Sequence, residues 1–234
     1  EPRDLYGLAA SWRQKRAQID SRADIATLEA NENNAREKYL KEAKKLSERR
    51  QQAAPRLAHA VSTLIQELGM QGGRFEVALT PTGQPTANGL EEVSFLVAGH
   101  TGATPRPVGK VASGGELSRI ALAIAVTTSR LGAAPTLIFD EVDSGIGGAV
   151  AQTVGRLMRQ LGQDRQVLAV THLPQVAASA DHHLFVSKKQ DDQGTASEVR
   201  AIADETRVQE LARMLGGDKL SDASLAHARE MLLP

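Results

Sequence analysis

The sequence contains no cysteine, which excludes disulfides and thiolate metal sites and favours a reducing compartment. Aromatic residues make up only 3% of the 234 residues, so aliphatic side chains must supply most of the core. The 28 basic and 28 acidic residues cancel, and any nucleic-acid surface must therefore be a local patch. The longest purely apolar run, Ile120 to Val126, is far shorter than the roughly 18 residues of a membrane helix, so we expect no membrane partner.

A phosphate-binding loop of the P-loop class is also missing. That motif reads G-x-x-x-x-G-K-[ST] and holds phosphates with backbone N–H groups. The one Gly-Lys pair is Gly109-Lys110, with Thr104 where the first glycine should stand and Val111 where a hydroxyl residue should follow. Two positions of the motif fail, so the chain has no such loop.

The first 68 residues are helical in character, because Gly7 is the only glycine before Gly69. Apolar residues recur every seven positions in two registers: Leu5, Trp12 and Ile19, then Ile25, Tyr39, Leu46, Ala53 and Ala60, with Glu32 interrupting the second. The pattern predicts a coiled-coil arm over residues 1–68, with a register slip near residue 21. Pro55 predicts a kink or the start of a new helix. An ordinary pair of surface helices is the alternative.

Residues 69–234 predict an α/β lobe. Strands are expected at 74–80, 92–99, 136–140, 166–171 and 182–188, with a further one near 196–203. Helices are expected at 115–130, 148–161, 174–179, 205–215 and 221–233. Because strands and helices alternate, we expect a mostly parallel sheet flanked by helices.

The stretch "TLIFDEVDSG" places Asp140 and Glu141 at the carboxyl end of an apolar strand, where α/β sheets bind ligands. An aspartate there can hold hydrated Mg²⁺, and a neighbouring glutamate can polarise water for attack on phosphorus. An acidic pair that caps a helix is the equally simple alternative.

Two other stretches carry polar residues at element ends. In "VASGGELSR", Ser113 precedes Gly114, Gly115 and Glu116 at the start of a long apolar helix, which is both a capping box and an anion site of free N–H groups. A capping box does not require two adjacent glycines. In "VTHLPQVAA", His172 follows a strand end, where a histidine is more often structural than a phosphate ligand.

Taken in order, "KVASGGELSR", "IFDEVDSGIGG" and "THLPQVAASADHH" resemble the signature motif, Walker B strand and switch histidine of ATP-binding-cassette ATPase heads. With the helical arm directly ahead, the chain resembles the SMC-like heads, and in particular the RecN family of bacterial DNA-repair ATPases. The tail "ELARMLGG…SLAHAREML" is similar to the same family. The resemblance implies the carboxyl-terminal half of such a protein: a returning arm and the second lobe of the head. Glu1 in place of methionine agrees with a piece of a longer chain.

The resemblance implies a role for each motif residue. Asp140 would bind Mg²⁺, Glu141 would act as general base, and His172 would contact the γ-phosphate of ATP. Ser113, Gly114, Gly115 and Glu116 would close over ATP held by a second head. Asp143 would lie in a loop, continuing through Ser144 and Gly145, at the seam between two heads.

The implied partners are the amino-terminal lobe that carries the phosphate loop, a second protomer, and DNA at double-strand breaks. The implied location is the cytoplasm, on the nucleoid. Between Arg36 and Arg50 there are seven basic and three acidic residues, which indicate either a phosphate-contacting stripe or a solvated helix face. Two other functions stay open: the nucleotide-binding subunit of a transporter, and a dimerising scaffold without activity.

Overall fold

The computed structural model describes residues 2–22, 25–111, 113–129, 131, 134–191, 194–217 and 220–233. These residues form two compact units, one of Glu1–Gln52 with Leu79–Glu92 and the other of Ala53–Ala78 with Val93–Pro234. The predicted domain boundary at residues 68 and 69 is a different division and stays a prediction.

The first unit is built on helix α1 (Pro2–Arg22) and the amino-terminal part of helix α2 (Ile25–Glu67). The predicted register slip near residue 21 falls at the end of α1. Leu5, Trp12 and Ile19 of the first heptad register are each at least 63% exposed. Apolar residues at seven-residue spacing on the surface of a long helix are what an unpaired coiled-coil strand presents.

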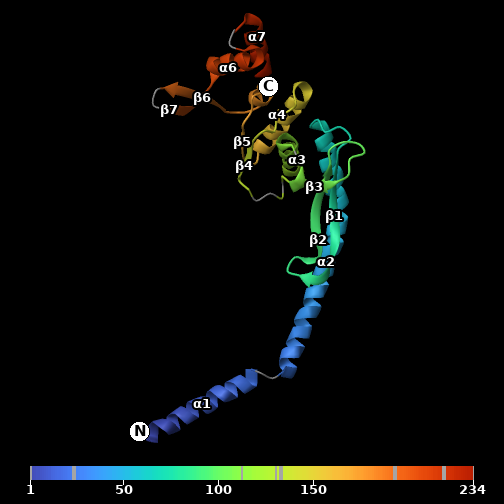
Figure 1. Cartoon of the computed structure of the whole chain (residues 1–234), viewed down its shortest axis with the longest axis vertical. Helices are drawn as coiled ribbons and strands as arrows, with labels where there is room; N and C mark the ends of the chain where they lie inside the picture. Colours follow the sequence, from blue (N-terminus) through green and yellow to red (C-terminus); the bar gives the residue numbers. More distant parts are fainter. Residues whose placement is uncertain are drawn as a thin grey trace. The chain divides into compact units, whose positions relative to one another are not determined.

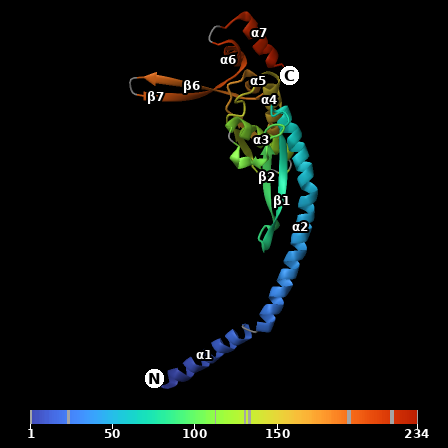
Figure 2. The same ribbon diagram turned by 45° about the vertical axis from the view of Figure 1, so that its right-hand side comes forward.

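In the same unit, the turn end of strands β1 (Arg74–Thr86) and β2 (Gly89–Ala98) packs along α2, and Figures 1 and 2 show the strands beside that helix. Ala43 and Ser47 are buried. The hydroxyl of Tyr39 donates to the carbonyl of Thr86 at 2.8 Å. Both strands extend further toward the turn than predicted. The glycine, proline and asparagine residues between them indicated a loop, but packing on the helix supports them as strand.

Helix α2 continues through Pro55, so the predicted alternative of a new helix at Pro55 is wrong, and the other alternative, a kink, stays a prediction. Proline removes one backbone hydrogen bond, but the turns that follow are held by packing. Val61 and Ile65 are fully buried, and they anchor the end of the helix in the second unit.

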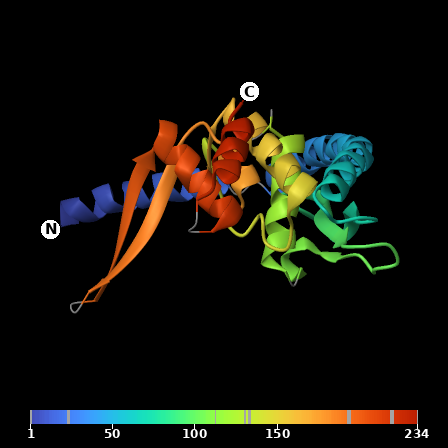
Figure 3. The same cartoon turned by 90° about the horizontal axis from the view of Figure 1, so that it is seen from above.

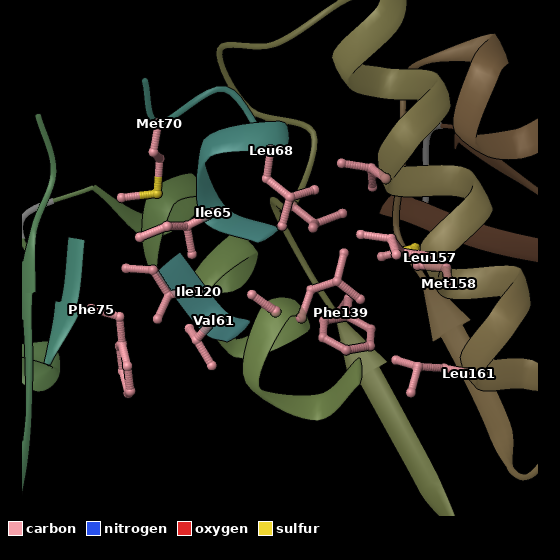
Figure 4. Close-up of a cluster of buried hydrophobic side chains, with 14 of the residues drawn as sticks. Val61, Ile65, Leu68, Met70, Phe75, Ile120, Phe139, Leu157, Met158 and Leu161 are labelled. Carbon is pink, nitrogen blue, oxygen red and sulfur yellow. The ribbon is translucent and has the colours of Figure 1, made fainter. Parts of the chain in front are cut away.

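The core of the second unit gathers aliphatic side chains from five elements, as expected from the low aromatic content. Figure 4 shows them converging from α2, β1, α3 (Gly114–Thr127), β4 (Thr136–Phe139) and α4 (Gly148–Gly162). The labelled members are Val61, Ile65, Leu68, Met70, Phe75, Ile120, Phe139, Leu157, Met158 and Leu161. Residues at the end of the predicted arm thus belong to the core of the lobe.

Strand β4 pairs in parallel with β5 (Gln166–Ala169), and the register joins Phe139 to Ala169. Strand β6 (His183–Asp191) pairs antiparallel with β7 (Gly194–Ile202), and β2 pairs antiparallel with β3 (Arg106–Pro107). A short 3₁₀ helix, η1 (Val108–Lys110), and helix α5 (Pro174–Ala178) complete the connections. The α/β fold class is confirmed, although parallel pairing among the described strands is confined to β4 and β5.

Helices α6 (Asp204–Gly216) and α7 (Asp222–Met231) pack on each other around Leu211, Ala212 and Ala228, and Figure 3 shows the β6–β7 hairpin extending away from them. Arg207 of α6 donates to the carbonyls of Ala177, Ala178 and Ala180 at the end of α5. A guanidinium at a helix carboxyl terminus satisfies carbonyls that lack a helical partner. Within the described ranges, no helix has the length and apolar character needed to cross a membrane.

Candidate functional site

The parallel pairing of β4 and β5 brings two of the predicted motifs to one sheet edge. Asp140 and Glu141 follow β4, and Thr171 and His172 follow β5. The N–H of Val170 donates to the carbonyl of Phe139 at 3.0 Å, so the two strands remain paired up to this edge. The carboxyl ends of parallel strands are where such sheets bind ligands.

The third motif reaches the same edge through helix α3. The hydroxyl of Ser118 donates to the carbonyl of Asp140 at 2.6 Å, which joins α3 to the end of β4. The fold therefore assembles the Ser113–Glu116 stretch, the Asp140–Glu141 pair and His172 around one loop, residues 140–145.

Asp140 and Glu141 are both exposed, and their backbone geometry is unusual. The N–H of Glu141 donates to Oδ1 of Asp140 at 2.9 Å, and Glu141 has a φ of 57°. The left-handed region costs a residue other than glycine about 1–2 kcal/mol, and such strain gathers at functional sites. The strand-end carboxylate of Asp140 suits Mg²⁺, which takes few protein ligands. The described residues contain no group of three His, Asp or Glu side chains placed to hold a metal by themselves.

Ser113 caps α3, because its Oγ accepts from the N–H of Glu116 at 3.4 Å. The second of the two glycines that follow is explained by a close approach within the lobe. A Cβ at Gly115 would lie 2.9 Å from the carbonyl oxygen of Ser144, whereas one at Gly114 would meet only the end of the exposed Glu141 side chain, which can move. The predicted contact of this motif with nucleotide stays a prediction, but Gly115 already has a structural reason in the loop that packs on it.

Arg119 fixes that loop from the side of α3. Its side chain is buried, and Nη1 donates to the carbonyl of Ser144 at 2.9 Å and to that of Val142 at 3.4 Å. Burial lowers the pKa of Arg119, and the charge of Glu116 acts in the opposite direction. A guanidinium remains charged at neutral pH, so these are charge-assisted bonds to backbone carbonyls.

Asp143 is 3% exposed, and its carboxylate turns toward the loop after β5. Oδ2 accepts from the hydroxyl of Thr171 at 2.5 Å and from the N–H of His172 at 2.9 Å. The ring nitrogen Nδ1 of His172 lies 3.3 Å from the same oxygen. The neighbouring Ser144 and Gly145 are exposed, and the place of this loop at a seam between two heads stays a prediction.

Sequence reasoning gave no role to Arg119, Ser118 or Thr171. A signal for Arg119 existed: it lies four residues after Gly115, on the helix face that also buries Ile120 and Ala123. A charged residue on an apolar helix face needs a buried partner. The partner of Thr171 is 28 positions away in the sequence, and no local pattern indicates it.

The fold is that of an SMC head lobe. The chain superimposes on a solved Smc head domain with a coiled coil and joint from Pyrococcus yayanosii, with a TM-score of 0.57 and 23% sequence identity. That likeness covers 84% of this chain and 36% of the solved one. No family model matches the sequence.

The chain belongs to the RecN family. It is 44% identical over 231 residues to the DNA repair protein RecN of Xylella fastidiosa strain Temecula1, covering 96% of this chain and 42% of that protein. It is 47% identical over 202 residues to RecN of Haemophilus influenzae, covering 86% of this chain and 36% of that protein. The resemblance seen in the motifs is confirmed, and the chain spans less than half the length of these relatives.

Proposed function

We propose that the chain is the carboxyl-terminal half of a RecN-type ATPase, which binds ATP between two heads and acts in DNA double-strand break repair and recombination. The observation that carries the proposal is the convergence of three motifs on loop 140–145. Asp140 and Glu141 stand at the end of β4, His172 at the end of β5, and α3 begins beside them.

An amino-terminal lobe is the partner that this arrangement requires. The phosphate loop is absent from the sequence, and β4 and β5 form a sheet of only two strands among the described residues. Ile138 on β4 and Val170 just after β5 are 70% and 62% exposed. Since two-stranded sheets are marginal in water, strands of another lobe would complete the sheet, and the rest of that lobe would cover these side chains.

In the complete head, the residues of this chain divide the chemistry. Asp140 would hold Mg²⁺, which neutralises phosphate charge when it is bound. Glu141 would position and deprotonate the attacking water, and His172 would donate a hydrogen bond to the terminal phosphate. Ser113 and the start of α3 would offer free N–H groups to the phosphates of ATP bound by a second protomer.

The proposed contact with DNA is supported by one face of α2. Lys38, Lys41, Lys45 and Arg49 are spaced three and four residues apart, so they share a helix face, and all four are exposed. We call these four residues the basic face. Ala43 and Ser47, on the opposite side, are covered by the β1–β2 hairpin. The basic face extends about 16 Å along the helix, which suits several successive phosphates of a duplex.

The test is to co-express this chain with the amino-terminal remainder of its parent protein and to measure ATP turnover. We expect turnover by the complex and none by the chain alone. Glu141→Gln should slow turnover by about 10²–10⁴ without weakening ATP binding, since the amide keeps the shape of a general base and loses its charge. A Glu141→Gln complex that hydrolyses ATP normally would remove Glu141 from this role.

The same experiment tests one alternative function, and the helical arm argues against the other. A dimerising scaffold predicts no turnover from the complete complex. A transporter subunit predicts a short helical insert ahead of α3, whereas the chain has a long helical arm there, and its similarity to RecN covers that arm.

A further inference from the structure

We propose that Asp143, together with Thr171, is a positioning residue that fixes the tautomer and orientation of the His172 ring, so that Nε2 is the nitrogen offered to the ligand. The inference rests on the proposed function for the role of His172, but the geometry that carries it lies wholly within this chain.

The carboxylate of Asp143 is buried against the segment that follows β5. Its side chain is 4% exposed, whereas that of His172 is 72% exposed. A buried carboxylate is tolerated when its lone pairs are occupied by hydrogen-bond donors. One oxygen, Oδ2, receives the Thr171 hydroxyl and the His172 N–H, and Nδ1 of the ring lies 3.3 Å from it.

The charge on Oδ2 decides which ring nitrogen carries the proton. In neutral imidazole one nitrogen is a donor and the other an acceptor. A carboxylate oxygen 3.3 Å away attracts an N–H and repels a nitrogen lone pair, which favours the proton on Nδ1 in the neutral ring. Nε2 is then the free nitrogen, and it becomes a second donor when the ring is protonated beside a phosphate.

Thr171 holds the same arrangement from the backbone side. Its Oγ1 donates to Asp143 and accepts from the N–H of Leu173 at 3.0 Å. Leu173 is the residue before α5, so the hydroxyl closes the short segment that carries His172. The segment is thereby tied to loop 140–145, which also carries Asp140 and Glu141.

The first experiment reads the tautomer directly and does not depend on activity. The chain is labelled with ¹⁵N at histidine, the His172 signals are assigned by their loss in His172→Gln, and the ring nitrogens are observed above the titration range of histidine. We expect an Nδ1–H tautomer in the wild type and in Asp143→Asn, whose amide oxygen still accepts. Asp143→Ala should shift the ring to the Nε2–H tautomer. An Nε2–H tautomer in the wild type, or no shift in Asp143→Ala, overturns the proposal.

The second experiment uses the complete ATPase. Asp143→Ala should lower turnover by about 10–100-fold, the usual effect of losing a group that orients a functional histidine, with partial recovery in Asp143→Asn. Asp164→Ala, in an exposed turn, is the matched control. In a His172→Gln background the effect of Asp143→Ala should largely disappear. Full additivity would show that Asp143 does not act through His172.

Two further measurements distinguish a loss of folding from a loss of function. Thr171→Val removes one hydroxyl and should weaken the preference for the Nδ1–H tautomer while the chain still unfolds cooperatively. An unchanged tautomer in this folded variant would contradict the role given to Thr171. A wild-type complex without turnover would refute the proposed ATPase, while the tautomer measurement would still decide the inference about Asp143.

Discussion

At the residue scale, the adjacent glycines Gly114 and Gly115 at the start of α3 are an unusual feature of the sequence, and packing accounts for part of it. Two adjacent glycines exceed what a capped helix needs, and the sequence suggested a role in binding an anion. The structure adds a second reason for Gly115, because a Cβ there would collide with the backbone of loop 140–145. A requirement of this kind depends on a segment 25 or more positions away, which no local pattern reveals.

We predict that Gly115→Ala destabilises the chain by about 1–3 kcal/mol, the typical cost of overpacking a close contact. The added methyl group would lie 2.9 Å from the carbonyl oxygen of Ser144 and 3.1 Å from Nη1 of Arg119. Urea unfolding measures the change. Gly162→Ala is the control, since nothing lies within 4 Å of its Cβ position, and it should leave stability unchanged or slightly raised. Equal effects of the two changes would contradict the close packing of α3 on the loop.

At the element scale, helix α2 illustrates what the sequence predicts well and what it does not. Its helical character, and the strands and helices of the lobe, follow from periodicity and turn residues, and most bounds agree within a few residues. The length of the β1–β2 hairpin was underestimated because Pro81, Pro85 and Asn88 indicated a loop. Contacts such as that of Tyr39 with Thr86, 47 positions apart, supply the support that local composition does not show.

Within α2, we predict that the basic face contributes to DNA binding by the complete protein. Replacing Lys38, Lys41 and Lys45 by glutamine should weaken DNA binding and make its salt dependence shallower. The negative slope of log affinity against log salt should shrink in magnitude by about 0.9 for each DNA phosphate that the variant no longer neutralises. The matched control replaces the same three lysines by arginine and should retain both affinity and slope. Equal DNA binding by the two triple variants would show that this face is only a solvated side of the arm.

Strand β6 and helix α6 supply a prediction about pH. Burial lowers the pKa of His183, Arg207 lowers it further, and Glu210 opposes the shift. A histidine whose pKa is lower in the folded than in the unfolded state stabilises the fold above about pH 6.5 and loses that contribution as pH falls. Urea unfolding at about pH 8 and about pH 5.5 should therefore show a smaller loss of stability in His183→Gln than in the wild type. His227→Gln, a change at an exposed histidine, should behave like the wild type.

At the scale of the whole molecule, the two units predict how far the arm can be shortened. The second unit begins at Ala53, and its core takes Val61 and Ile65 from the end of α2 and Leu68 just after it. Deleting residues 1–50 should leave a cooperative thermal transition, because long exposed helices contribute little packing of their own. Deleting residues 1–68 should abolish that transition, since it removes three buried side chains. Cooperative unfolding after the longer deletion would contradict the assignment of these turns to the core.

The exposed faces of β4 and β5 have a consequence for how the proposed parent protein is made. A ribosome releases the amino-terminal lobe first and the carboxyl-terminal lobe last, with the arms synthesised between them. Ile138 and Val170 would then emerge only after the lobe that covers them exists, and these apolar side chains would be exposed only briefly. A chain expressed without that first lobe keeps these side chains in contact with the cell for its whole lifetime. Its solubility in a cell should therefore depend on chaperones far more than that of the full-length protein.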